Sequence, residues 1–171
     1  MEWTELDPSD WRSICDLTLT LKQARLSTVP RDAWMYSKYK EIWVNVDEIH
    51  CKQAFRHFMN LLNRAVYGNA VRRHGKRLRV IAVVEKETSG RWHLHVAIEP
   101  PIHMTFEQFA ATIRSCWRKT DWGYDELMVR RGANEGWIEY MLKSRQKSDL
   151  DAWIDCIDLD TLHNPPKFAD A

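Results

Sequence analysis

The stretch LRVIAVVEKETSGRWHLHVAIEPP, residues 78–101, decides the fold. It contains two apolar runs, 78–86 and 92–99, on either side of a polar turn at 87–91. Short runs rich in valine and isoleucine predict strands, and a short turn containing Gly90 predicts that the two strands pair as an antiparallel hairpin.

The second strand of this hairpin carries two histidines on one face. Side chains alternate across a strand, so His93 and His95 point the same way and Leu94 points the other. If the five-residue turn sets the register, Glu85 lies opposite His93, and directly paired residues share a face. The opposite face of the hairpin is apolar and suits helix packing: Val80, Ala82, Val84, Leu94, Val96 and Ile98.

Glu85, His93 and His95 therefore form a candidate metal site. Two imidazoles and one carboxylate, with the remaining positions open, suit a divalent cation that also binds substrate. An open position accepts a phosphate oxygen, which the metal then polarises. The motif also allows other interpretations: polar residues on an outer sheet face, a structural zinc site, or a different metalloenzyme.

Periodicity and capping residues predict the remaining elements. We expect strands at 14–21 and 124–131, a strand or extended lead-in at 41–49, and helices at 52–68, 105–120 and 134–146. Gly68 suits the end of the first helix, and Thr105 with Gln108 fits a capping box at the start of the second.

The order β-α-β-β-α-β-α indicates an α+β fold of the ferredoxin-like, split βαβ type. We expect a central antiparallel sheet with the two-histidine strand in its middle. Helices cover one face, and the other face is free for a site. A basic loop at 72–77 precedes the hairpin.

The length of 171 residues suits one compact domain. No apolar run approaches the roughly 20 residues of a membrane span, and the acidic N-terminus is unlike a signal peptide, so we expect a cytoplasmic protein without a membrane partner. The four cysteines are far apart in sequence, which favours reduced, mostly buried thiols over a disulfide framework or a structural zinc site.

The net charge of +1 hides an asymmetry along the chain. Residues 1–71 are balanced (9 − 9 = 0), residues 72–147 carry +6 (15 − 9), and residues 148–171 carry −5 (1 − 6). The basic middle is a candidate nucleic-acid footprint, although a solvated surface of mixed charge is the alternative. Of the nine tryptophans, most are expected in the core, and one or two could stack on unpaired bases.

The last predicted helix carries Tyr140 and Lys143, three residues apart on neighbouring positions of one face. A phenol has a pKa near 10, so its attack on a phosphodiester is helped by a nearby cation. Lys143 could orient the phosphate or stabilise developing charge. The alternative is that Tyr140 only packs against the apolar stripe of the helix.

Three stretches in this order carry a family resemblance: DLTLT (16–20), VVEKETSGRWHLHVAIEPP (83–101) and GWIEYMLK (136–143). Through them the chain resembles the HUH endonuclease superfamily over roughly residues 14–147. It looks most like the single-tyrosine rolling-circle replication initiators of small plasmids and single-stranded DNA phages.

The resemblance implies a metal-dependent nicking and joining enzyme. His93 and His95 would bind Mn²⁺ or Mg²⁺, with Glu85 completing the site. Tyr140 would attack single-stranded or origin hairpin DNA, form a 5′-phosphotyrosine and free a 3′-hydroxyl that primes synthesis, with assistance from Lys143. The nicking domain would span 1–147.

Two features of the chain depart from the family. No Walker motif for a helicase is present, and 148–171 reads as a peripheral acidic tail, so a host helicase and polymerase are the expected partners. Because the overall charge is near neutral, DNA affinity depends on local basic patches. The candidates are Arg72, Arg73, Lys76, Arg77, Arg130 and Arg131.

Two alternatives stay open: a single-tyrosine transposase or relaxase, and a non-catalytic DNA-binding module derived from an initiator. A zinc deaminase is disfavoured because the chain lacks both H-x-E and P-C-x-x-C.

Overall fold

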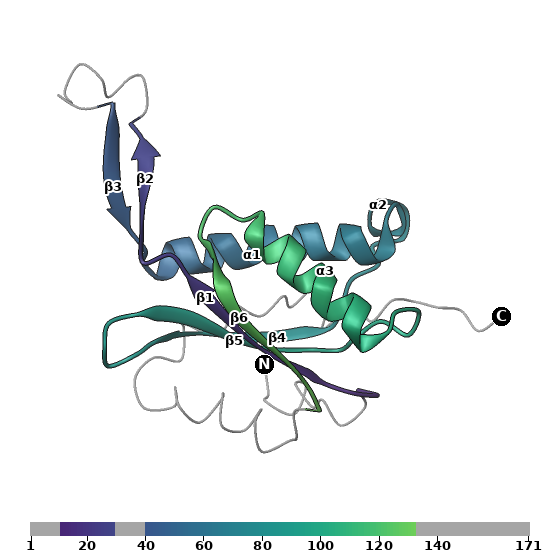
Figure 1. Ribbon diagram of the computed structural model, residues 1–171. Helices are drawn as coiled ribbons and strands as arrows, with labels where there is room; N and C mark the ends of the chain where they lie inside the picture. Colours follow the sequence, from purple (N-terminus) through teal and green to yellow (C-terminus); the bar gives the residue numbers. More distant parts are fainter. Residues whose placement is uncertain (1–10, 30–39, 133–171) are drawn as a thin grey trace, which may run out of the picture.

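A computed structural model of the protein describes residues 11–29 and 40–132. It contains a four-stranded sheet, two longer helices, a short helix and a separate pair of strands (Figure 1). The elements are β1 (Cys15–Leu21), β2 (Ala24–Thr28), β3 (Glu41–Asn45), α1 (Glu48–Tyr67), α2 (Ala70–His74), β4 (Val80–Lys86), β5 (Trp92–Ile98), α3 (Phe106–Arg118) and β6 (Gly123–Arg131). The helix expected from residue 134 lies outside the described residues.

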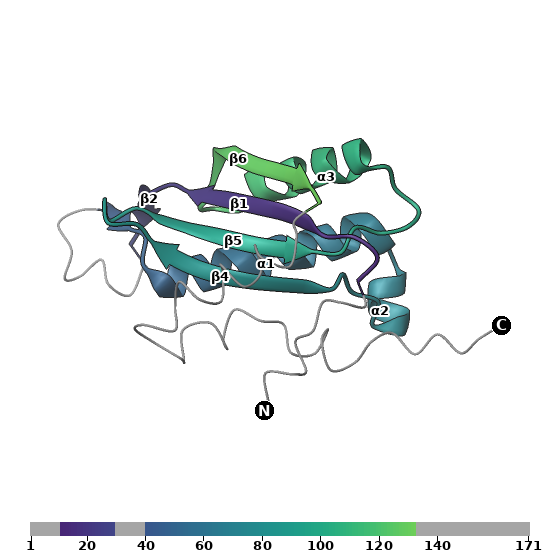
Figure 2. The same ribbon diagram turned by 90° about the horizontal axis from the view of Figure 1, so that it is seen from below.

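The main sheet has the strand order β4-β5-β1-β6, and every neighbouring pair is antiparallel. Helices α1 and α3 lie together on one face of this sheet (Figures 1 and 2). The predicted α+β, ferredoxin-like arrangement is confirmed. Strand β5, which carries both histidines, is one of the two inner strands, as expected.

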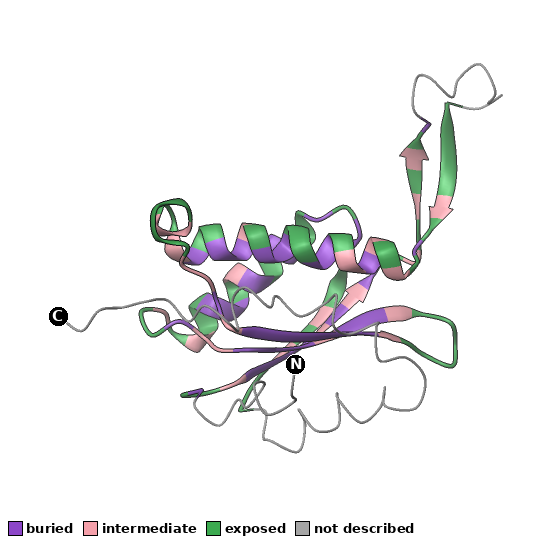
Figure 3. Cartoon of the chain, turned by 180° about the vertical axis from the view of Figure 1, so that it is seen from behind, coloured by how far each residue is buried: buried purple, intermediate pink, exposed green. Residues whose placement is uncertain are grey.

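The helix-facing side of the sheet forms the main core. Alternate residues of the four-stranded sheet are fully buried there, and the burial pattern follows the strands and the inner surfaces of both helices (Figure 3). Phe58 of α1 and Trp117 of α3 meet edge to face, with ring centroids 5.5 Å apart. The whole predicted apolar face of the β4–β5 hairpin belongs to this core: Val80, Ala82, Val84, Leu94, Val96 and Ile98.

The outer face of the sheet is less open than expected. Ile81, Val83 and Ala97 lie on this face and are buried in a second apolar cluster with Trp11, against which Ile14 packs. The prediction of an outer face wholly free for a site was therefore wrong. Because the residues before β1 cover one end of the face, only the end near the β4–β5 turn remains polar.

Capping residues set the helix boundaries. Asp47 accepts a hydrogen bond from the backbone N–H of His50 at 2.8 Å, so α1 begins at Glu48, four residues before the expected start. Gly68 ends α1 as predicted, with φ at 55°. The capping box of Thr105 and Gln108 is also confirmed, with reciprocal hydrogen bonds of 2.9 and 3.2 Å.

Two segments differ from the sequence prediction. β2 was not predicted, and it pairs with β3 along Ala24–Thr28 to form a separate ribbon. Part of the expected basic loop is helical, because α2 spans Ala70–His74 and ends at Gly75 in the left-handed conformation, φ 64°. Among the described helices, none is long and apolar enough to cross a membrane.

Candidate metal centre

The polar end of the outer face brings residues from three strands together. Glu85 of β4 lies opposite His93 of β5, which confirms the register that the turn length predicted. On the other side of β5, Thr20 and Thr18 of β1 lie opposite His93 and His95. Directly paired residues share a face, so these five side chains form one polar patch.

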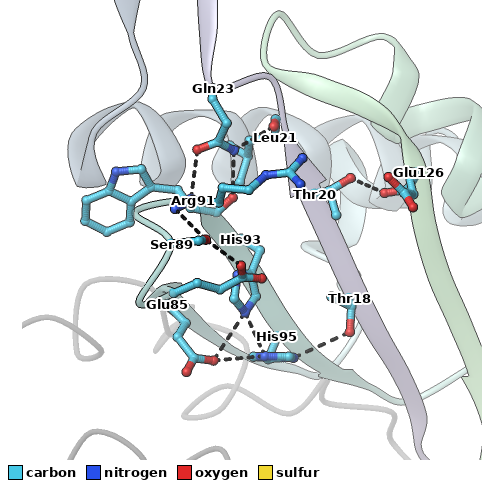
Figure 4. Close-up of polar contacts among 12 residues, drawn as sticks. Thr18, Thr20, Leu21, Gln23, Glu85, Ser89, Arg91, His93, His95 and Glu126 are labelled. Atoms are coloured by element: carbon cyan, nitrogen blue, oxygen red, sulfur yellow. Dashed lines mark hydrogen bonds and ion pairs between the residues drawn. The ribbon is translucent and has the colours of Figure 1, made fainter.

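The three candidate ligands converge on one point (Figure 4). Oε2 of Glu85 lies 3.2 Å from Nε2 of His93 and 3.0 Å from Nε2 of His95. The two Nε2 atoms are 3.0 Å apart, and the imidazole rings are nearly perpendicular, at 89°. One ligand atom from each residue lies within 4.8 Å of the others.

This donor set fits a divalent cation. Two imidazole nitrogens and a carboxylate oxygen that face one another repel unless a proton or a cation lies between them. A single proton can satisfy only one pair of these atoms, whereas a cation among them would contact all three. Glu85, His93 and His95 can therefore hold a metal ion together.

The outer nitrogens of both imidazoles also meet oxygen atoms. Nδ1 of His95 lies 3.5 Å from the hydroxyl of Thr18, within hydrogen-bond range. Nδ1 of His93 is buried, and its nearest charged group is the Glu87 carboxylate at 3.5 Å. The hydroxyl of Ser89 donates to that carboxylate at 2.8 Å. Outer contacts of this kind orient metal-ligating histidines.

Sequence reasoning assigned no role to Thr18 or Glu87. Thr18 lies within the DLTLT stretch, and alternation along β1 places it on the site face once the pairing of β1 with β5 is known. Glu87 follows Glu85 by two residues, so the same alternation could have found it. The missing information was which strand lies beside β5.

Burial controls the protonation of the site. Removal from water lowers the pKa of His95, and the neighbouring His93 lowers it further, while the Glu85 carboxylate acts in the opposite direction. A neutral imidazole keeps the lone pair that a metal ligand needs. The exposed side-chain fractions are 10% for His93, 19% for His95 and 29% for Glu85, so a substrate reaches the cluster from the Glu85 side.

A side-chain amide fixes the strand that carries the histidines. Nε2 of Gln23 donates to the carbonyl oxygens of Leu21 at 2.8 Å and Trp92 at 3.1 Å, and Oε1 accepts the Trp92 N–H at 2.9 Å (Figure 4). Trp92 immediately precedes His93. Gln23 thus joins the end of β1 to the start of β5, beside the first histidine.

Four of the predicted DNA-binding residues lie away from the cluster. Arg72 and Arg73 are exposed on α2, which precedes β4 at the end remote from the β4–β5 turn (Figure 1). Lys76 lies over the ring of Tyr67, and Arg77 donates to a backbone carbonyl of α2. These residues form a basic surface at the opposite end of the sheet from the histidines.

The two arginines of β6 point to different faces. Arg130 pairs with Asp16 across β1 and β6, so it shares the outer face with the metal cluster. Burial raises the pKa of Asp16, and the charge of Arg130 partly offsets this rise. Arg131 faces the helices, 3.4 Å from Glu107 and over the ring of Phe106. Arg130 alone of the six basic candidates lies on the face of the cluster.

Tyr140 and Lys143, the predicted nucleophile and its assisting cation, lie outside the described residues. Their relation to the cluster remains a prediction from the sequence.

The fold and the cluster define a class of protein: a ferredoxin-like domain with a two-histidine, one-carboxylate metal centre on the sheet face opposite its helices. The sequence matches the model of the replication-associated protein ORF2 family over residues 15–149, and the chain belongs to this family. Membership supports a role in replication initiation. Neither the curated proteins nor the solved structures include a significant match to the chain.

Proposed function

We propose that the protein is a metal-dependent endonuclease and strand transferase that nicks and rejoins single-stranded DNA at a specific site, and so initiates rolling-circle replication. The observation that carries this proposal is the convergence of Glu85, His93 and His95 within 4.8 Å on the open end of the sheet. Membership of a replication-associated family supports DNA as the substrate.

The proposed nucleophile is the phenol oxygen of Tyr140. It attacks the scissile phosphorus, and the bond from phosphorus to the 3′-oxygen breaks. The proton lost by the phenol balances the one gained by the departing 3′-hydroxyl, and the 5′-phosphate stays attached to Tyr140. Joining is the reverse reaction. Lys143 stabilises the charge that develops on the phosphate.

The three ligands would hold Mn²⁺ or Mg²⁺, and a bound cation polarises the phosphate that is attacked. The proposed nicking domain spans residues 1–147, with 148–171 as a peripheral acidic segment. The DNA is single-stranded or an extruded origin hairpin, and a host helicase and polymerase supply unwinding and synthesis.

The decisive experiment compares Tyr140→Phe with the wild-type protein. Each is incubated with a random single-stranded DNA library and Mn²⁺, and denaturing gels detect protein bound covalently to DNA. We expect the wild-type protein to form the adduct and Tyr140→Phe to form none while still binding DNA. Tyr124→Phe is the matched control, because Tyr124 is a 43% exposed tyrosine on β6. Adduct formation by Tyr140→Phe at the wild-type level would refute the mechanism.

A further inference from the structure

The β2–β3 ribbon stands apart from the main sheet and extends away from the body of the protein (Figures 1 and 3). Leu26 and Trp43 lie directly opposite each other in its register, so their side chains share one face. Trp43 is 73% exposed and Leu26 is 47% exposed. We refer to these two side chains as the arm face.

Trp43 differs from the other tryptophans that the structure describes. Trp11, Trp117 and Trp122 are buried, and Trp92 is half-buried against the core. Tryptophan is the side chain that gains most from leaving water, so a tryptophan left nearly bare on a thin ribbon indicates a surface that binds something.

The other side of the ribbon is attached to the body. Alternation places Arg25 and Val44 on the face opposite the arm face. Arg25 forms an ion pair with Asp121 at 3.1 Å and lies 5.1 Å from the centroid of the Trp122 ring, while Val44 packs against the main core. The ribbon is therefore held at its root in a fixed orientation, with the arm face turned away from these contacts.

We propose that the arm face binds unpaired bases of single-stranded DNA, with Trp43 as a stacking platform. This inference rests on the proposed function and names a second contact surface for its substrate. Aromatic stacking accepts any base, because every base has a π-face.

The charge of the segment favours a nucleic acid over a protein partner. The sequence 22–45 carries five lysines and arginines against two acidic residues, a net charge of +3 (5 − 2). Lys22 and Lys40 flank the ribbon and are exposed in the described structure. An apolar, aromatic surface within a basic segment matches the pattern of proteins that bind single strands through stacking and phosphate contacts.

The root of the ribbon lies beside the metal cluster. Thr20 pairs with His93, and β1 ends one residue later, at Leu21. Gln23 then binds the backbone of Trp92, next to His93. From Thr20 to Leu26 the chain spans at most about 20 Å, at roughly 3.3 Å per residue. A DNA strand that leaves the cluster at this end meets the ribbon within a few nucleotides.

The test measures binding separately from cleavage. A labelled random-sequence single strand of about 30 nucleotides, long enough for the usual site sizes, is titrated with protein in chelator, and fluorescence anisotropy gives the Kd. We expect Trp43→Ala to weaken binding about tenfold, the size of one lost stacking contact, and Trp43→Phe to retain most of the affinity. Ile102→Ala is the matched control, because Ile102 is 76% exposed outside the ribbon.

Three results would overturn the inference. The first is equal affinity of Trp43→Ala and the wild-type protein for the single strand. The second is an equal loss of affinity for a duplex of the same length, because paired bases do not expose their faces for stacking. The third is a change in the mass of the assembly in sedimentation, which would make the arm face an interface between copies of this chain.

A cross-linking experiment on the wild-type protein avoids any dependence on folding of the variants. Single strands containing 5-bromouracil are irradiated with the protein, and mass spectrometry locates the attached peptide. We expect attachment at Trp43, whereas attachment confined to other peptides would contradict the inference. The covalent-adduct assay is run in parallel. Failure of the wild-type protein to form adduct refutes the nicking function, while the binding comparison still decides the role of the arm face.

Discussion

The side-chain amide of Gln23 pairs with both backbone polar groups of Trp92, at 2.9 and 3.1 Å. The amide takes the place of a neighbouring strand, because β1 has already ended at Leu21. Trp92 precedes His93 directly, so this pairing fixes the backbone from which the first proposed ligand projects. The root of the β2–β3 ribbon is thereby joined to the metal cluster.

We predict that Gln23→Ala weakens Mn²⁺ binding about tenfold, within the range seen when groups that orient metal ligands are removed. Gln23→Glu keeps the acceptor for the Trp92 N–H and loses the donor, so we expect an intermediate affinity. Isothermal titration calorimetry measures both, and circular dichroism checks that each variant is folded. A folded Gln23→Ala protein with wild-type Mn²⁺ affinity would contradict this role.

Thr18 allows a sharper test of an outer contact. Thr18→Val removes the hydroxyl that lies 3.5 Å from Nδ1 of His95 and leaves the shape of the side chain nearly unchanged. We expect Mn²⁺ affinity to fall by roughly 10-fold in Thr18→Val and to change little in Thr18→Ser. Thr28→Val, on the exposed end of β2, is the control. The same affinity for the Val and Ser variants would show that the hydroxyl does not orient the imidazole.

The sequence predicted the metal cluster well because its geometry is local. A five-residue turn fixes the pairing of Glu85 with His93, and alternation along one strand brings His95 to the same face. The Gln23–Trp92 pairing spans 69 residues and has no periodic signal, so only the assembled sheet reveals it. Thr18 and Glu87 were likewise missed because their roles depend on contacts outside the two-histidine motif.

The errors in the fold have similar physical causes. The strand ARLST (24–28) is short and half polar, and it becomes a strand only by pairing with β3. The start of α1 depends on the extended backbone of Asp47 and its hydrogen bond to His50, which the apolar periodicity from residue 52 does not show. The burial of Ile81 and Val83 on the outer face depends on Trp11, which lies 70 residues earlier in the chain than Ile81 (81 − 11).

The cap of α1 gives a prediction for stability and its dependence on pH. The backbone N–H of His50 is the main cause that lowers the pKa of Asp47 below its ordinary value of 3.8. A lowered pKa in the folded state means that the ionised cap stabilises the protein above pH 3.8, and that this stabilisation is lost as the pH falls below that value. Asp47→Ala is expected to lower the free energy of unfolding by about 1 kcal/mol at neutral pH.

Urea denaturation at neutral pH and at a pH below the ordinary value measures this effect. The difference between wild-type protein and Asp47→Ala should shrink in acid. Asp47→Asn, which caps without ionising, should stay closer to the wild type at neutral pH. A difference that is equally large at both pH values would contradict the ionic part of the cap.

The buried cysteines give a test of the packing. Cys15, Cys51 and Cys116 are free and buried, as the sequence predicted, and burial raises the pKa of Cys15 to about 11 despite the opposing charge of Arg131. Burial also raises the pKa of Cys116. In a Cys156→Ser background, we expect thiol reagents to label the native protein slowly and all three thiols to react in denaturant, because the thiolate is the reactive form. Rapid labelling of the native protein would contradict the described core.

The strongest test of the site removes its ligands one at a time. Glu85→Gln, His93→Ala and His95→Ala each delete one of three atoms that lie within 4.8 Å of one another. We expect each variant to lose Mn²⁺ affinity by more than the roughly 10- to 100-fold typical of outer contacts, and to lose covalent attachment to DNA with it. Calorimetry and the denaturing gel measure the two losses. His74→Ala, an exposed histidine on α2, should leave both unchanged. Adduct formation by His93→Ala in the presence of chelator would show that cleavage does not use this site, because a phenol lacking a cation beside the phosphate is a weak nucleophile at neutral pH.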